Sequence, residues 1–183
     1  MHAMKELPNI LTIARIVLIP VILSALYLVS KTGCWVAAIL FALASITDYF
    51  DGALARSLDA QTSFGRVLDP IADKLLVAST LMMLVYLDRA PLVPAILILC
   101  REIVVSGLRE YLSEFKVSIP VSNLAKIKTG IQFVAILILI LGQQEVVSIP
   151  LVHYFGQAAL WIAAMLTIFT GFAYMKEGFK RVG

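Results

Sequence analysis

The feature that most constrains this chain is a succession of apolar runs, each about as long as a lipid bilayer is thick. The runs cover residues 11–29, 34–55, 65–87, 92–112, 124–141 and 154–175. A membrane-spanning helix needs about 20 mostly apolar residues, and the connections between these runs are short. We therefore predict an all-α integral membrane protein whose 183 residues form a single domain of six transmembrane helices.

The composition excludes other broad classes of protein. Hydrophobic residues make up 61% of the chain and charged residues 15%, whereas a soluble domain has about 45–50% and about 25%. The chain therefore has too few polar residues to cover a soluble surface, and its apolar content excludes disorder. Its two cysteines, Cys34 and Cys100, lie within apolar runs, which excludes a disulfide scaffold. The first run is too long for a signal peptide, so we expect a retained helix.

The positions of lysine and arginine predict how the helices are oriented. With the N-terminus in the cytoplasm, twelve of the fifteen fall on the inner side or at inner helix ends, Lys31 and Arg89 fall outside, and Arg101 lies within a span. The inner residues are Lys5, Arg15, Arg56, Arg66, Lys74, Arg109, Lys116, Lys126, Lys128, Lys176, Lys180 and Arg181. Because cytoplasmic loops are enriched in lysine and arginine, we predict that both termini are cytoplasmic.

Four aspartates near the junction of the second and third runs are the most informative charges. Asp48 and Asp51 are three residues apart, and Asp69 and Asp73 are four apart, so each pair lies on one helix face. A short inner loop makes the two helices antiparallel and brings both pairs to the same depth. One aspartate at mid-membrane costs about 2.5–3.5 kcal/mol, and clustered carboxylates stay ionised only beside cations. Such oxygen ligands predict a hard divalent metal: Mg²⁺, Mn²⁺ or Ca²⁺.

The residues around the aspartates suit a phosphate ligand beside the metal. Gly52 and Ala55 share the face of the first pair, Gly65 shares that of the second, and Arg56 lies one turn beyond Gly52. Small residues leave room for a ligand, and arginine binds phosphate well. A single acidic pair is equally well explained as a helix cap. Two pairs with aligned small residues favour a metal–phosphate site, and the lack of nearby histidine or cysteine argues against zinc.

These residues resemble the signature of the CDP-alcohol phosphotransferase family. The family pattern is D-x2-D-G-x2-A-R-x8-G-x3-D-x3-D, and the sequence from Asp48 to Asp73 matches it at all eight specified positions. Three flanking segments, residues 8–15, 101–110 and 124–129, resemble the branch of the family that uses sn-glycerol 3-phosphate. The resemblance thus extends over nearly the whole chain.

The resemblance implies a function, partners and a location. It implies a homodimeric enzyme of the bacterial inner (cytoplasmic) membrane, surrounded by membrane lipids, with its active site facing the cytoplasm and no role for nucleic acid. The enzyme would displace CMP from CDP-diacylglycerol with sn-glycerol 3-phosphate, forming phosphatidylglycerol phosphate. Two Mg²⁺ (or Mn²⁺) ions per site would be held by Asp48, Asp51, Asp69 and Asp73, and Asp73 would also act as general base. The implied CDP-diacylglycerol pocket comprises Asn9, Thr12, Gly52, Ala55, Arg56, Thr62 and Gly65.

The acceptor is a phosphate dianion and therefore needs cations near the metals. Arg109, Lys126 and Lys128 lie at inner helix ends and are candidates, with snorkelling to the membrane surface as the alternative explanation. Arg101 lies deeper and is a further candidate for binding the acceptor. Adjacent residues point about 100° apart on a helix, so we expect Arg101 and Glu102 not to pair with each other. The two could instead belong to a structural ion network in which Glu102 pairs with a lysine of a neighbouring helix.

Three other functions stay open at this point. The same fold could use another acceptor alcohol, such as inositol phosphate or serine, because the shared motif does not distinguish acceptors. A divalent-cation transporter also needs intramembrane carboxylates, but it predicts acidic residues along a path to the outer face. The outer half has almost none apart from Asp88 and Glu145. A structural membrane subunit with an interfacial metal leaves the small residues and Arg56 unexplained.

Overall fold

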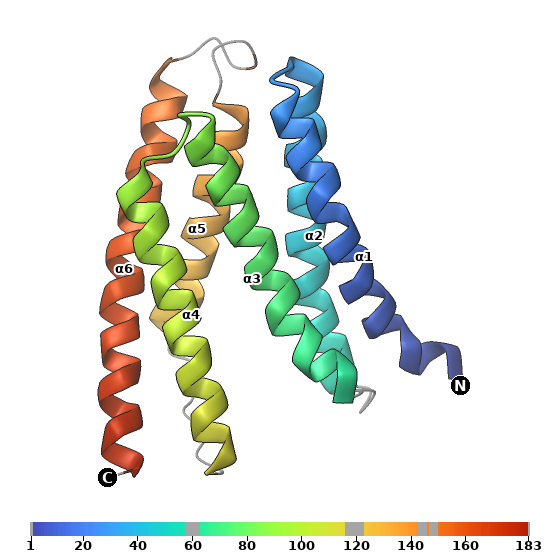
Figure 1. Ribbon diagram of the computed structural model, residues 1–183, viewed down its shortest axis with the longest axis vertical. Coiled ribbons are helices and arrows are strands. Elements are labelled where there is room, and N and C mark those ends of the chain that lie inside the picture. Colours follow the sequence, from blue (N-terminus) through green and yellow to red (C-terminus); the bar gives the residue numbers. More distant parts are fainter. Residues whose placement is uncertain (1, 58–62, 116–122, 143–145, 147–149, 183) are drawn as a thin grey trace.

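A computed structural model of the protein describes residues 2–57, 63–115, 123–142, 146 and 150–182. These residues form six α-helices and contain no strand. The helices are α1 (His2–Tyr27), α2 (Lys31–Ser57), α3 (Ser63–Tyr86), α4 (Leu92–Glu114), α5 (Asn123–Leu141) and α6 (Pro150–Val182) (Figure 1). The predicted all-α class and the six predicted helices are therefore confirmed for the described part of the chain.

The helices begin and end where the sequence supplies suitable residues. Pro91 immediately precedes α4 and Pro150 is the first residue of α6, positions at which the missing proline N–H has no helical partner to lose. Asp88, just after α3, has a φ of 56°, a left-handed conformation that aspartate adopts more readily than most residues. The sixth predicted run, residues 154–175, underestimates α6, which is extended at both ends.

The six helices run alternately up and down and divide into two groups of three. α1 packs against both α2 and α3, and α6 packs against both α4 and α5. α2 with α5, and α3 with α4, make the main contacts between the groups. The N-terminal ends of α1, α3 and α5 and the C-terminal ends of α2, α4 and α6 lie at one end of the bundle (Figure 1). We call this the terminal end.

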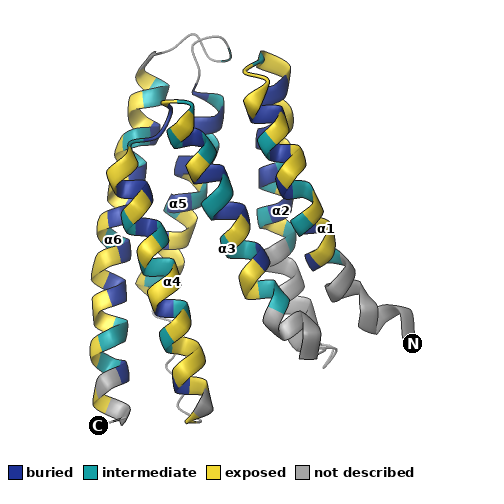
Figure 2. Ribbon diagram, viewed as in Figure 1, coloured by how far each residue is buried: buried dark blue, intermediate teal, exposed yellow. Residues whose placement is uncertain are grey.

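The core lies on the faces that the helices turn toward one another, and apolar side chains also cover the outside. Phe41, Leu76, Ile98 and Ile140 are among the largest fully buried side chains. Exposed surface nevertheless alternates with buried surface along every helix (Figure 2), and many of the exposed residues are large hydrophobics such as Phe169. An apolar exterior of this extent suits lipid rather than water.

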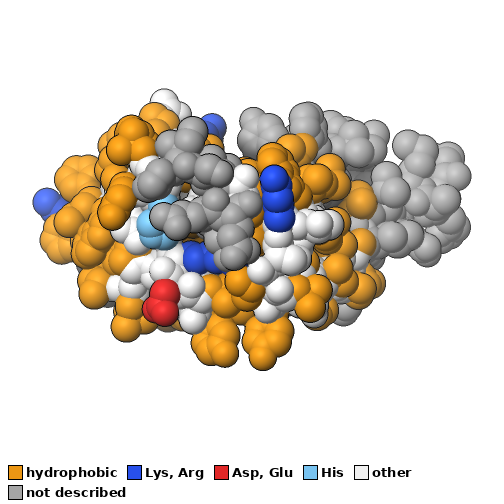
Figure 3. Space-filling view, turned by 90° about the horizontal axis from the view of Figure 1, so that it is seen from above, with side chains coloured by type: hydrophobic (Ala, Val, Ile, Leu, Met, Phe, Trp, Pro, Cys, Tyr) orange, Lys and Arg blue, Asp and Glu red, His pale blue; other side chains and the backbone are white. Residues whose placement is uncertain are grey.

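The hydropathy of the helices also suits lipid rather than water. Two described segments, Asn123–Leu141 and Leu151–Gly178, are long and apolar enough to cross a membrane, and Leu11–Tyr27 and Lys31–Thr47 are shorter apolar helices. Viewed from the end opposite the termini, the described surface is mostly hydrophobic at its rim and carries few charged side chains (Figure 3). The described helices therefore form an apolar bundle that suits a membrane environment.

Candidate active site

The structure describes side chains over only part of the predicted site. They are described for residues 11–47, 68–113, 115, 123–142, 146, 151–178 and 180. The predicted site residues outside this set are Asn9, Asp48, Asp51, Gly52, Ala55, Arg56, Thr62 and Gly65. The geometry below therefore concerns Asp69 and Asp73 of the motif, together with the described groups from other helices that lie near them.

Asp69 lies where α1 packs against α3. Its Oδ1 accepts a hydrogen bond from the hydroxyl of Thr12, a residue 57 positions earlier in the chain. Thr12 is only 2% exposed, whereas Asp69 is half-buried. The contact brings together a predicted residue of the nucleotide pocket and a predicted metal ligand. A hydroxyl donor orients a carboxylate but does not neutralise its charge, so Asp69 keeps its capacity to bind a cation.

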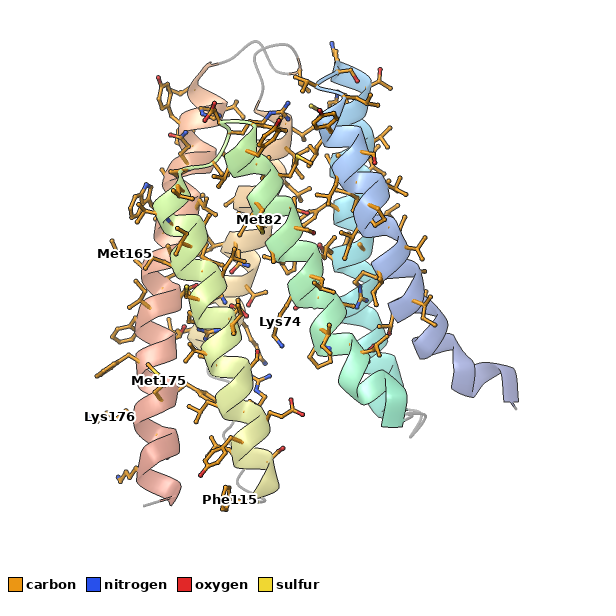
Figure 4. The ribbon with its side chains drawn as sticks, viewed as in Figure 1. Lys74, Met82, Phe115, Met165, Met175 and Lys176 are labelled. Carbon is orange, nitrogen blue, oxygen red and sulfur yellow. The ribbon has the colours of Figure 1, made fainter. Side chains whose placement is uncertain are left out.

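Asp73, one turn beyond Asp69, lines a cavity of ≈ 240 Å³ between α3, α4 and α5. The polar lining residues are Asp73, Lys74, Glu102, Lys128, Thr129 and Gln132. The apolar lining residues are Val77, Ala78, Met82, Leu99, Ile103 and Phe133. Lys74 extends from α3 on the side that faces α4, and Met82 lies about two turns further along the same helix (Figure 4).

The apolar part of this cavity reaches the outside of the bundle. Met82 on α3 is 64% exposed and Ile103 on α4 is 69% exposed, although both line the cavity. The cavity thus combines a polar part around Asp73 with an apolar part that opens on the exterior between α3 and α4. A ligand with a charged headgroup and hydrocarbon chains matches both parts.

An ion network connects the cavity to α4 and α6. The Lys128 ammonium, on a side chain that is 3% exposed, forms a salt bridge with Glu102 Oε1. Arg101 Nη1 lies 3.1 Å from the same oxygen, and Arg101 Nη2 donates a 3.2 Å hydrogen bond to Thr170 Oγ1 on α6. The predicted pairing of Glu102 with a lysine of a neighbouring helix is therefore confirmed.

The expectation that Arg101 and Glu102 do not pair with each other is wrong. Their Cα–Cβ directions differ by about 100°, but the long arginine side chain bends round the helix and reaches the neighbouring carboxylate. Gly171 on α6 makes room for this path, because a Cβ there would lie 2.9 Å from Arg101 Cγ. Two cations thus share one carboxylate, which leaves a net positive charge beside the cavity.

Of the four predicted acceptor-binding cations, Lys128 lines the cavity, whereas Arg101, Arg109 and Lys126 do not. Lys126 is exposed on the first turns of α5. The Arg109 guanidinium is also exposed and lies 5.9 Å from the ring centroid of Tyr174 on α6, at the distance of a cation–π contact. Their proposed roles in binding the acceptor stay predictions, whereas Lys128 lies in the same cavity as Asp73.

Gln132 is a polar cavity residue that sequence reasoning missed. It is 3% exposed, and its Oε1 has no hydrogen-bond partner among the described residues. A signal was available in the sequence, because Gln132 is the only polar residue in the segment 131–141. It also lies four residues after Lys128, hence on the same helix face.

Comparison with known proteins identifies the family. Residues 5–169 match the CDP-alcohol phosphatidyltransferase family, and the chain belongs to it, which confirms the family resemblance of the sequence motif. Members of this family use divalent metal ions.

Its relatives carry a more particular name. The chain is 52% identical over 172 residues to the CDP-diacylglycerol–glycerol-3-phosphate 3-phosphatidyltransferase of Rickettsia felis, covering 94% of each chain. It is 53% identical to the enzyme of the same name from Rickettsia typhi, covering 94% of this chain and 97% of the relative. The Bacillus subtilis enzyme of that name is 39% identical over 97% of both chains.

Proposed function

We propose that this chain is a CDP-diacylglycerol–glycerol-3-phosphate 3-phosphatidyltransferase. It transfers the phosphatidyl group of CDP-diacylglycerol to sn-glycerol 3-phosphate and releases CMP. The observation that carries the proposal is the cavity in which Asp73 of α3 and Lys128 of α5 lie together. A carboxylate that can accept a proton and an ammonium that can bind phosphate are what an anionic alcohol requires of its binding site. The names of the relatives support this choice of substrates.

In the proposed reaction Asp73 is the general base. The primary hydroxyl oxygen of glycerol 3-phosphate attacks the phosphorus that carries the diacylglycerol, and its proton passes to the Asp73 carboxylate. The bond from that phosphorus to the CMP oxygen breaks as the new phosphodiester bond forms. Lys128 holds the acceptor phosphate, and Arg101 supports Lys128 through Glu102. Arg109 and Lys126 draw the dianion toward the cavity mouth.

The motif aspartates suit Mg²⁺ or Mn²⁺, with two ions per site. Among the described residues, His, Cys, Asp and Glu form no group of three or more that could hold a metal, so Asp48 and Asp51 are needed to complete the ligand set. Asp69 and Asp73 contribute half-buried carboxylates on consecutive turns, and hard divalent ions prefer such oxygen ligands. When bound, the ions would neutralise charge on the pyrophosphate and on departing CMP. Thr12 orients the Asp69 carboxylate from the neighbouring helix.

The other predicted residues of the CDP-diacylglycerol pocket form the proposed nucleotide site. These residues are Asn9, Gly52, Ala55, Arg56, Thr62 and Gly65. Arg56 binds a phosphate of the pyrophosphate, and the small residues allow the cytidine to approach the backbone of α2 and α3. The diacylglycerol occupies the apolar part of the cavity and leaves the bundle between α3 and α4.

The proposed setting is a homodimer in the bacterial inner membrane, each chain a single domain with six spans. The terminal end of the bundle faces the cytoplasm, where it meets water-soluble glycerol 3-phosphate. Support comes from the twelve lysines and arginines assigned to that side against two on the other, and from the apolar exterior of the helices.

The test is release of CMP by purified protein in detergent–lipid micelles with CDP-diacylglycerol and Mg²⁺. The acceptors sn-glycerol 3-phosphate, inositol phosphate, serine and inositol are supplied in parallel. We expect release with glycerol 3-phosphate alone, and its loss on addition of EDTA. Release with a different acceptor alone would support the transfer reaction and show that glycerol 3-phosphate is not its acceptor. No release with any acceptor, from folded and metal-loaded protein, would overturn the proposed enzyme.

A further inference from the structure

Gln132 has no role in the site as described so far, yet its environment is unusual for an amide. Its side chain is 3% exposed in the apolar part of α5, and its Oε1 lacks a hydrogen-bond partner among the described residues. Folded proteins leave few buried polar atoms unpaired, and those that remain often face a ligand or an ordered water. Gln132 also lines the cavity that contains Asp73. Its Oε1 has almost no accessible surface, so the amide must turn about its last torsion for that oxygen to meet a ligand.

The size and lining of the cavity favour a ligand over one bridging water. A single water needs about 10–15 Å³ of probe volume, far less than the ≈ 240 Å³ present. Around this space Lys128 offers a cation, Asp73 a carboxylate and Gln132 an amide, from two different helices. Lys128 and Gln132 are four residues apart on one face of α5, so they can contact adjacent groups of one molecule. A molecule carrying a phosphate and two hydroxyls matches these three groups.

We propose that Gln132 is a specificity residue for the acceptor. When the acceptor binds, the amide turns about its last torsion and Oε1 accepts a hydrogen bond from the secondary hydroxyl of the glycerol phosphate. The phosphate of the same molecule is held by Lys128, and its primary hydroxyl is directed at Asp73. This inference rests on the proposed function, and it adds a residue that neither the sequence motif nor its flanking segments include. Three separate attachment points favour an acceptor with both hydroxyls over one that lacks the secondary hydroxyl.

The experiment combines an enzyme variant with a substrate variant. CMP release is measured for the unmodified protein, for Gln132→Met and for the control Ile136→Met. Each is supplied with sn-glycerol 3-phosphate and with 3-hydroxypropyl phosphate, which lacks the secondary hydroxyl. Ile136 is buried one turn beyond Gln132 and does not line the cavity, so its replacement reports packing alone. If 3-hydroxypropyl phosphate reacts too slowly, its inhibition constant against glycerol 3-phosphate provides the same comparison.

We expect Gln132→Met to lower kcat/KM for glycerol 3-phosphate about tenfold, the effect of one hydrogen bond. The value for 3-hydroxypropyl phosphate should change little, and Ile136→Met should leave the preference between the acceptors unchanged. The Tm of the free Gln132→Met protein should be equal or higher, because an unpaired buried acceptor is removed. Equal losses for both acceptors, no loss for either, or a lower Tm would overturn the inference. If the unmodified protein itself releases no CMP with glycerol 3-phosphate, the proposed function fails first.

Discussion

The two three-helix groups meet at the cavity, and the charged residues in and near it are compensated differently in each group. The α1–α3 group supplies Asp69 and Asp73, and Thr12 gives Asp69 a hydrogen bond without a neutralising charge. The α4–α6 group supplies Arg101 and Lys128, which are held by a carboxylate of their own group, Glu102. In the proposed function the acidic side takes its cations from bound metal, whereas the basic side carries a counter-charge within the fold. This difference predicts which substitutions affect chemistry and which affect stability.

The largest effect is expected on the acidic side, at the proposed base. Asp73→Asn should lower kcat by about 10²–10⁴-fold, the usual contribution of general acid–base catalysis. The matched control is Asp88→Asn, in the exposed turn after α3 at the opposite end of the bundle. Rates of CMP release at saturating substrate provide the measurement. Comparable rates for Asp73→Asn and the unmodified protein would remove Asp73 from the reaction.

The basic side should respond mainly through stability. Glu102→Gln leaves Arg101 and Lys128 largely buried without their shared carboxylate, and breaking such a network costs about 3–5 kcal/mol. The control Glu110→Gln lies on the exposed surface of the same helix and should change the free energy of unfolding by less than about 0.5 kcal/mol. Denaturant unfolding in micelles compares the two.

The coupling within the network can be isolated by a second substitution. Adding Lys128→Met to Glu102→Gln removes one of the uncompensated cations, so the double variant should be more stable than Glu102→Gln alone. If the loss of stability in the double variant equals the sum of the losses in Glu102→Gln and Lys128→Met, the salt bridge contributes nothing measurable. Titration with EDTA should separate the two sides further, since the proposed function places metal ions only on the acidic side.

A smaller effect is expected for Gly171→Ala on α6, because the lack of a Cβ at Gly171 leaves room for the Arg101 side chain. An added methyl group would lie 2.9 Å from Arg101 Cγ, and crowding of this kind costs about 1–3 kcal/mol. Gly107→Ala on α4 is the control, because an added Cβ there meets nothing within 4 Å. It should be neutral or stabilise the helix by up to about 1 kcal/mol. Opposite signs in thermal unfolding would confirm the contrast, and equal shifts would contradict it.

The smallest effect is expected where α1 contacts the acidic side. Thr12→Val removes the hydrogen bond to Asp69 and should cost about 1 kcal/mol of stability, with weaker metal binding. The buried hydroxyl of Thr80 on α3 has no hydrogen-bond partner among the described residues, so Thr80→Val should be neutral or stabilising. Metal titration of activity, together with unfolding, compares the pair. A rise in stability for both variants would show that the Thr12 contact is unimportant.

The same contrast explains what could be predicted from sequence. The acidic motif lies within 26 positions, and helical periodicity alone places each aspartate pair on one face. The six helices follow likewise from the lengths of the apolar runs. On the basic side the contacts join residues far apart, since Lys128 is 26 positions from Glu102 and Thr170 is 69 positions from Arg101. Helix packing, which no local pattern specifies, decides such contacts.

Two details show where local rules were insufficient. The rule that adjacent helical residues point about 100° apart describes only their Cα–Cβ directions. The long, flexible side chain of Arg101 nevertheless reaches the carboxylate of Glu102. Gln132 could have been noticed as a single amide in an apolar segment, but only the tertiary structure places it beside Asp73 in one cavity. Periodicity identifies which face a residue occupies, and packing decides what that face meets.

The exposed apolar rim of the cavity, at Met82 and Ile103, has a kinetic consequence. In the proposed function a donor lipid diffusing laterally in the bilayer reaches this opening without crossing water, whereas the soluble acceptor arrives from the aqueous phase. The rate of the first encounter therefore depends on the mole fraction of donor lipid in the membrane. The rate of the second depends on the molar concentration of the acceptor in water. Diluting the micelle surface with inert detergent should slow turnover even when the bulk amount of donor lipid stays fixed. An enzyme with such an opening responds to the composition of the membrane in which it resides.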